Sequence, residues 1–248
     1  MLDVMGGITI AGVAVLLVAA LARFAHLEAA QRRTLFVIAG VWFAAFAILG
    51  AAGLFMRPPG ISTMLLGLGV LLPVLAGLVF LARSSTGRAI ASRTPLAALV
   101  GLHVTRSLGV AFLALLAAGR LPRTFALTAG WGDIVVAATA IPVAWAVHRR
   151  TPGWRWVTAI WNTYAIADLV TAVTLGQGST PGSPTRFIFE SPGSGAITTL
   201  PWVMVPVFLV PFYFLIHLVI FRRLAVAAHD EAARRAAPPA AGRQVAAL

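Results

Sequence analysis

The 248-residue chain contains no cysteine and no lysine, and only 7 acidic residues. Without cysteine it has no disulfides, thiolate metal sites, iron–sulfur clusters or cysteine nucleophiles. Without lysine no Schiff base can form, which excludes a retinal-binding pump of the seven-helix kind. Charged residues make up 10% of the chain, against about 25% in a soluble protein. A chain so poor in charge could not solvate its own surface, so most of that surface must face something other than water.

Apolar residues are abundant instead, at 60% of the chain, whereas a soluble domain has roughly 45–50%. A helix needs about 20 apolar residues to cross the hydrocarbon core of a bilayer. Seven segments meet this requirement: 4–22, 34–55, 61–82, 95–118, 124–147, 156–175 and 200–221. They lack the period-two alternation of barrel strands, and lipid requires backbone polar groups to be paired within a segment. We therefore predict an all-α integral membrane protein, with a seven-transmembrane-helix bundle in residues 1–221.

The arginines predict the orientation of this bundle. Nineteen arginines and 7 acidic residues give the chain a net charge of +12. Fourteen arginines lie on one side of the predicted membrane, four lie on the other, and Arg106 lies within the fourth segment. Basic residues concentrate in cytoplasmic loops, so we expect the N-terminus outside and the C-terminus in the cytoplasm. The tail, residues 222–248, is expected to be basic, helical at first and then disordered.

The same charges predict the partners and the location of the protein. We expect the cytoplasmic arginines to attract anionic lipids of the inner leaflet, and we expect no nucleic-acid partner. The composition, rich in alanine, arginine and glycine, is typical of GC-rich bacteria, which favours the bacterial inner membrane. An export signal at residues 4–22 is the alternative for the first segment. Asp3 precedes that segment and the positive charge follows it, which is the reverse of a signal peptide.

Two ionisable residues fall at matching depths in this scheme. Arg106 lies roughly 17 Å from the cytoplasmic edge of the fourth segment, and Asp168 lies roughly 18 Å from the same edge of the sixth. Arginine cannot deprotonate to escape the cost of burial, so it needs an anionic partner. The sequence therefore predicts an Arg106–Asp168 ion pair halfway across the membrane.

Asp133 has two interpretations. If the fifth helix begins near Thr124, Asp133 lies close to the same depth as the predicted pair. If the helix begins at Trp131, Asp133 caps its N-terminus at the outer interface. The sequence leaves both open.

Other polar residues share faces with this pair. His103 precedes Arg106 by three residues, and Tyr164 precedes Asp168 by four, so each shares a helix face with its neighbour. With Asn162 also present, the sixth segment is expected to be the central helix. His217 is expected to be an interfacial residue near the cytoplasm.

Two further features are expected to shape the last helix and its approach. Pro206 and Pro211 predict a kink in the seventh segment that frees backbone carbonyls. The connection 176–199 is too long for an ordinary turn, so it is either a lid or a flexible connector.

We therefore predict a polar intramembrane site that binds or transports a small solute, a lipid-like molecule or a proton. Asp168 would titrate, Arg106 would hold its charge and His103 would relay protons. Asp133, Asn162 and Tyr164 would complete a water-filled pocket between the fourth, fifth and sixth helices. A small-molecule ligand is possible. We expect no cofactor, no metal and no enzymatic activity.

Three alternatives compete with this hypothesis. The charges could serve only to fix the packing of the helices. An intramembrane enzyme could hold zinc with His103, Asp133 and Asp168, but Arg106 would repel the cation. A haem carrier could use His103 and His217 as axial ligands, but their estimated depths differ by about 7 Å.

Overall fold

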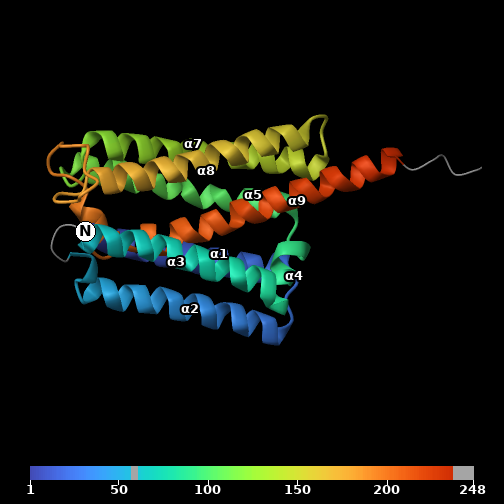
Figure 1. Cartoon of the computed structure of the whole chain (residues 1–248), viewed down its shortest axis with the longest axis horizontal. Helices are drawn as coiled ribbons and strands as arrows, with labels where there is room; N and C mark the ends of the chain where they lie inside the picture. Colours follow the sequence, from blue (N-terminus) through green and yellow to red (C-terminus); the bar gives the residue numbers. More distant parts are fainter. Residues whose placement is uncertain (57–60, 237–248) are drawn as a thin grey trace, which may run out of the picture.

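The computed structural model describes residues 1–56 and 61–236, with residues 230–236 described by their backbone alone. Within these ranges the chain is helical and has no strand. The long helices are α1 (Leu2–Phe24), α2 (Ala29–Ala51), α3 (Ile61–Arg83), α7 (Arg123–Arg149), α8 (Trp154–Gly178) and α9 (Val210–Ala236) (Figure 1). The shorter elements are η1 (Leu54–Met56), α4 (Ser85–Arg93), α5 (Leu96–Gly101), η2 (Leu102–Gly109), α6 (Val110–Ala117), η3 (Gly195–Thr198) and η4 (Val205–Leu209).

Six helical segments in the described ranges are long and apolar enough to cross a membrane: α1, α2, α3, α5–η2–α6, α7, and α9 with η4. Large apolar side chains are exposed along α2 and α3, among them Val41, Leu72 and Val79. Soluble proteins rarely expose such a continuous apolar surface, whereas lipid accepts it. The protein is therefore a multi-pass, membrane-embedded helical bundle. The predicted sixth segment is α8, which is long enough at 25 residues but less apolar than the other six.

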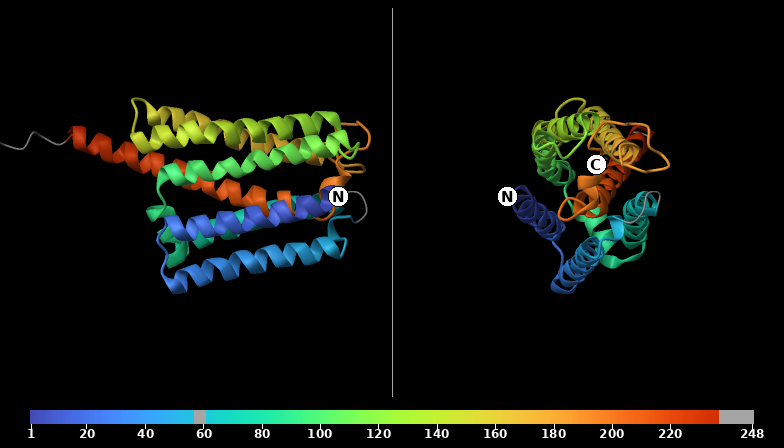
Figure 2. Two further views of the ribbon diagram at one scale, coloured as in Figure 1. Left: turned by 180° about the vertical axis from the view of Figure 1, so that it is seen from behind. Right: turned by 90° about the vertical axis from the view of Figure 1, so that its left-hand side faces the viewer.

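The central helix of the bundle is α9, not the predicted sixth segment. In the most apolar stretch of α9, 72% of the residues are buried. Figure 2 shows α9 between two groups of helices, α1–α3 on one side and α5–α8 on the other. The prediction failed because it assumed that polar side chains on α8 need protein partners. Thr163, Thr171 and Thr174 are exposed and each donates to a carbonyl four residues earlier in α8, which satisfies the hydroxyl locally.

Pro206, before α9, and Pro211, within it, disturb the backbone hydrogen bonds of this segment, as predicted. Residues Val205–Leu209 form a π-helical turn, η4, which begins next to Pro206. Pro211 has no N–H to donate to the carbonyl of Val207, four residues earlier. The indole of Trp42 on α2 donates to that carbonyl instead, at 3.1 Å. A carbonyl freed by proline thus becomes an anchor between α2 and the central helix.

The long connection after α8 is tied to the helix ends that it joins. The amide of Phe187 donates to the carbonyl of Gly178 at 2.9 Å, and Thr180 and Ser194 share a hydroxyl hydrogen bond at 2.9 Å. The carboxylate of Glu190 accepts hydrogen bonds from the Thr124 amide, at 2.8 Å, and from the Thr124 hydroxyl. The hydrogen bond from the Thr124 hydroxyl is the main reason that the pKa of Glu190 lies below its ordinary value. These bonds favour a closed cover over one end of α7 and α8 rather than a loose connector.

The opposite end of the bundle carries most of the arginines. Its turns and helix ends hold Arg23, Arg32, Arg33, Arg83, Arg88, Arg93, Arg149, Arg150, Arg155, Arg222 and Arg223. The guanidinium of Arg223 donates to the carbonyls of Ala91 and Thr94, which joins α9 to the end of α4. Beyond Arg223, α9 continues to Ala236 and extends past the other helices (Figure 1). The disorder predicted for the end of the tail falls on residues 237–248, outside the described residues.

Candidate functional site

The candidate site begins with a 3₁₀ stretch inside a membrane-spanning segment. Between α5 and α6 the chain forms eight residues of 3₁₀-helix, η2. Such stretches rarely exceed three or four residues, and side chains three apart lie directly above one another. His103, Arg106 and Gly109 therefore form one row, and η2 packs along α7.

Two glycines bring the three helical segments of the site together. A Cβ on Gly109 would lie 2.5 Å from the Cβ of Asp133 and 2.7 Å from the carbonyl oxygen of Gly130. A Cβ on Gly132 would overlap the carboxylate of Asp168. Only glycine allows η2 and α8 to approach α7 this closely.

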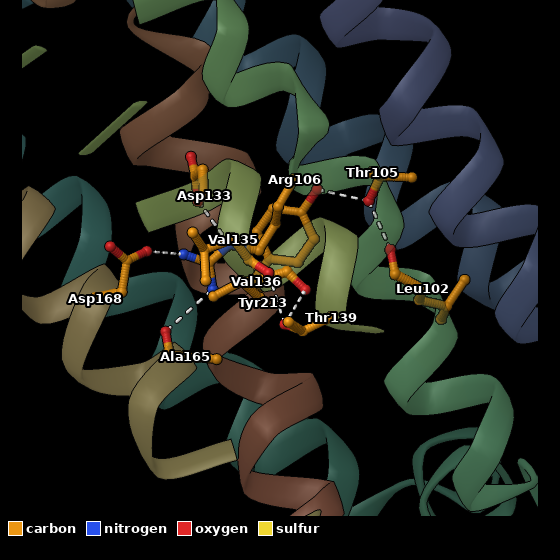
Figure 3. A network of polar contacts seen from close by, with 10 residues as sticks. All are labelled: Leu102, Thr105, Arg106, Asp133, Val135, Val136, Thr139, Ala165, Asp168 and Tyr213. Carbon is orange, nitrogen blue, oxygen red and sulfur yellow. Dashed lines mark hydrogen bonds and ion pairs between the residues drawn. The ribbon is translucent and has the colours of Figure 1, made fainter. Parts of the chain in front are cut away.

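Arg106 lies at the meeting point of η2, α7 and α8, and its side chain is fully buried. Its Nε donates to Asp133 Oδ1 at 2.6 Å, and its Nη2 donates to the carboxylate of Asp168. Its Nη1 donates to the carbonyl of Ala165 at 3.0 Å (Figure 3). The side chains of Asp133 and Asp168 are 18% and 7% exposed. We call Arg106, Asp133 and Asp168 the ion cluster.

The structure distinguishes the two interpretations of Asp133. Because α7 begins at Arg123, Asp133 lies well inside the helix and does not cap it. Its carboxylate faces the guanidinium from α7 while Asp168 faces it from α8, so one cation meets two anions.

Tyr213 on the central helix completes the surroundings of Arg106, and the sequence did not single it out. Its ring centroid lies 5.8 Å from Arg106 Cζ, in cation–π range. Its hydroxyl shares a hydrogen bond with the Thr105 hydroxyl at 2.7 Å, and Thr105 donates to the carbonyl of Leu102 at 2.7 Å (Figure 3). Tyr213 is one of only two tyrosines in the chain. A hydroxyl within so apolar a segment was the available signal, because a buried tyrosine hydroxyl usually finds a partner.

A second polar group, the histidine pair, consists of His103 on η2 and His217 on α9. Their rings stack with centroids 4.1 Å apart and planes inclined by 22°, and both residues are fully buried. Asn162 on α8 bonds to His217 Nδ1 at 2.7 Å and donates to the His217 carbonyl at 3.2 Å. Among the described residues, neither nitrogen of His103 nor Nε2 of His217 has a hydrogen-bond partner.

The histidine pair corrects two predictions. His217 is buried rather than interfacial, and the 7 Å mismatch in depth between the two histidines was wrong. Both errors arose from counting depth back from residue 221, whereas α9 continues to Ala236, so residue 221 is not a helix end. The geometry still does not fit a haem, because axial ligands face one iron from opposite sides of a porphyrin, and rings stacked at 4.1 Å leave no space for one.

Tyr164 lies outside the site, contrary to the prediction. It is 47% exposed, whereas Asp168 is 9% exposed. The buried stripe of α8 runs through Trp161, Asn162, Ala165 and Asp168. Because α8 lies at the rim of the bundle, this stripe is narrow, and a residue four positions from Asp168 can fall beyond its edge.

The cavities at the site are too small for a solute. A cavity of about 20 Å³ lies against Arg106, Asp133 and Tyr213, which is enough for about one water molecule. A second cavity, of about 50 Å³, lies beneath the long connection and is lined by Gln177 and Ser194 among others. The two cavities share three lining residues: Phe112, Val205 and Val210. The prediction of a water-filled pocket for a solute was therefore wrong in size.

The arrangement also does not favour the zinc hypothesis. Among the side chains described, those of residues 1–56 and 61–229, no group of three histidines, aspartates or glutamates is placed to hold a metal ion. The carboxylates of Asp133 and Asp168 are both engaged by Arg106.

Fold and site together define a helical membrane protein with a buried cluster of one arginine and two aspartates. A family model described as a domain of unknown function, DUF8737, matches residues 61–225, which is about two-thirds of the chain. The chain belongs to this family. The matched region contains the ion cluster and the histidine pair, and it excludes α1 and α2. No curated protein and no solved structure matches the chain.

Proposed function

We propose that the chain crosses the bacterial inner membrane seven times, with its N-terminus outside. The support for a seventh crossing is α8, which packs along α7 and matches its length despite its polar residues. The support for the orientation is the gathering of arginines at the end of the bundle opposite the N-terminus.

We further propose that the ion cluster is a proton-binding site. One arginine and two carboxylates leave the cluster with one excess negative charge. An uncompensated charge is costly in a low-dielectric interior, and one proton shared by the two carboxylates removes it. The excess carboxylate at Arg106 is the observation that carries this proposal.

The size of the space around the cluster favours a proton over a solute or a lipid-like molecule. A cavity of about 20 Å³ admits a single water molecule. The neighbouring 50 Å³ cavity extends toward the outer end, where Gln177 and Ser194 offer polar groups. A proton can enter by this route through transiently placed water.

On the opposite side of the cluster, the histidine pair is the candidate proton relay. The ring of Tyr213 lies 5.4 Å from that of His103 and also contacts Arg106, so it joins the two groups. Asn162 holds His217 on the side toward α8. Imidazoles whose nitrogens are free to accept or donate suit a relay.

The test is proton uptake by the purified protein in lipid nanodiscs. We expect a titration to show one proton bound per molecule, with a matching carboxylic-acid band in the infrared spectrum. Asp133→Asn and Asp168→Asn should each abolish this uptake, because the remaining carboxylate and Arg106 balance. Glu28→Gln is the control, since Glu28 is exposed at the N-cap of α2 and is not part of the cluster. Unchanged uptake in both cluster variants would refute the proposal.

A second experiment separates storage of a proton from its passage. Liposomes containing the protein and a trapped pH indicator are given a potassium diffusion potential. Passage requires the relay, so we expect His103→Phe to stop acidification while proton uptake at the cluster persists. If no flux occurs in the wild-type protein, the cluster binds a proton without moving it across the membrane.

A structural role is the second candidate, because Arg106 joins η2, α7 and α8. This role predicts that Arg106→Ala destabilises the protein by about 3–5 kcal/mol, since it leaves two buried carboxylates unpaired. It also predicts no carboxylic-acid signal in the wild type. The infrared measurement therefore distinguishes the two functions.

A further inference from the structure

The hairpin of α1 and α2 carries a basic depression at its turn. A cavity of about 440 Å³ is lined by Arg23, His26 and Arg32, with Leu27 and Phe36 among its apolar walls. The three basic side chains are exposed at the ends of two membrane-spanning helices. This is the level at which lipid headgroups lie.

These three side chains make no side-chain interaction with the described part of the protein. Within the described part of the chain, no side-chain hydrogen bond or ion pair is formed by Arg23, His26 or Arg32. The nearby acid, Glu28, is occupied as the N-cap of α2, where it accepts a backbone N–H and Gln31 bonds back to the Glu28 amide. Among the described residues, the arginines of the depression therefore have no ion-pair partner.

An apolar groove continues from this depression into the membrane. A cavity of about 190 Å³ runs between α1 and α2, with Ala11 and Ala14 on one wall, Gly40 and Phe43 on the other, and Phe208 of η4 as its floor. Phe36 lines both spaces. Small residues leave the groove open: a Cβ on Gly40 would meet no atom within 4 Å.

We propose that this hairpin binds one anionic phospholipid. Its phosphate lies between Arg23 and Arg32, and one of its acyl chains lies along the groove between α1 and α2. From Arg23 to Ala11 the site is about 18 Å long at the rise of an α-helix. Guanidinium groups suit phosphate because they donate two parallel hydrogen bonds to its oxygens.

The proposal is independent of the proton site. The hairpin lies outside the matched family region, residues 61–225, and does not contain any residue of the ion cluster. Failure of one proposal therefore leaves the other standing.

Lipid retention measured by native mass spectrometry tests the proposal. The full chain is released from nanodiscs of phosphatidylglycerol or phosphatidylcholine. We expect one phosphatidylglycerol, and no phosphatidylcholine, to stay bound to the wild type. The double variant Arg23→Ala/Arg32→Ala should weaken retention roughly tenfold or more, since each arginine contributes about 1 kcal/mol at a membrane surface. Arg83→Ala/Arg149→Ala is the matched control, which removes the same charge from the same end of the bundle and should retain the lipid.

A groove-filling variant tests the acyl chain separately. Gly40→Leu occupies the groove and keeps both arginines, so we expect it to lose the lipid as well. Inorganic phosphate is added as a competitor, and we expect it not to displace the lipid. The proposal is overturned if the two double variants behave alike, which would mean diffuse attraction by charge. It is equally overturned if phosphate displaces the lipid and Gly40→Leu has no effect, which would mean a phosphate site without an acyl chain.

Discussion

At the scale of single residues, Gly132 controls how closely Asp168 approaches α7. We expect Gly132→Ala to lower the free energy of unfolding by about 1–3 kcal/mol, because the new methyl group overlaps the Asp168 carboxylate. Gly12→Ala is the control, since a Cβ there meets nothing within 4 Å and alanine favours the helix by about 1 kcal/mol. Denaturant titration in detergent measures both. Equal stability of the two variants would contradict the packing described at the cluster.

The sequence predicted part of the ion cluster, namely the pairing of Arg106 with Asp168. An arginine in the middle of the membrane needs an acidic partner, and the matching depths of Arg106 and Asp168 in the sequence indicated which one. The place of the second acid, Asp133, could not be predicted in the same way. It depends on where α7 begins, and hydropathy does not locate the start of a helix to within a few residues. The sequence could not predict the stacking of His103 on His217, because the stacking depends on where α9 ends and on how α9 lies against η2.

At the scale of helices, the bond from Trp42 to Val207 compensates for Pro211. We expect Trp42→Phe to destabilise the bundle by about 1–3 kcal/mol, because the Val207 carbonyl loses its donor while the ring contacts with Phe208 are kept. In a Pro211→Ala background the restored amide can donate to that carbonyl, so the same change should cost less. A double-mutant cycle of unfolding free energies measures the difference. Additive losses would show that the two positions act separately.

The long connection should loosen in acid through Glu190. Its pKa is lowered in the folded protein by the hydrogen bond from Thr124, so the tether is fully present above the ordinary glutamate value of 4.5. It is lost as the pH falls through the lower folded value. We expect hydrogen exchange in residues 179–194 to be faster in Glu190→Gln than in the wild type at neutral pH. The two proteins should converge in acid, and a difference that is constant with pH would refute the tether.

At the scale of the whole molecule, the lack of cysteine makes the topology directly testable. Single cysteines are introduced as Ser191→Cys in the long connection and as Ala30→Cys and Thr151→Cys at the arginine-rich end. In intact cells stripped of their outer membrane, a membrane-impermeant maleimide should label only the first. The other two should react after the membrane is opened. Protection of Ser191→Cys together with Thr151→Cys, which would place both residues on one side, would show that α8 does not make a seventh crossing.

Hydropathy predicted an all-helical membrane bundle, and six of the seven predicted segments are long and apolar enough to cross a membrane, because lipid imposes length and apolarity on each crossing. It could not predict which helix is central. The position of a helix in the bundle depends on whether its polar side chains form hydrogen bonds within the same helix, as those of Thr163 and Thr171 do. It also depends on whether protein or lipid covers its apolar surface. Apolar residues look alike in either case, so α9 and α2 could not be told apart by composition.

The eight residues of η2 make this crossing longer and more tightly wound than an α-helix of the same residues. At about 2.0 Å per residue they span about 4 Å more than they would as α-helix, and they are wound tighter by about 160° in all. Relaxation of η2 to α-helix would retract the chain and swing Arg106 out of line with His103. The three hydrogen bonds from the Arg106 guanidinium oppose that movement. Protonation of Asp133 or Asp168 would weaken one of these bonds and so make the movement easier.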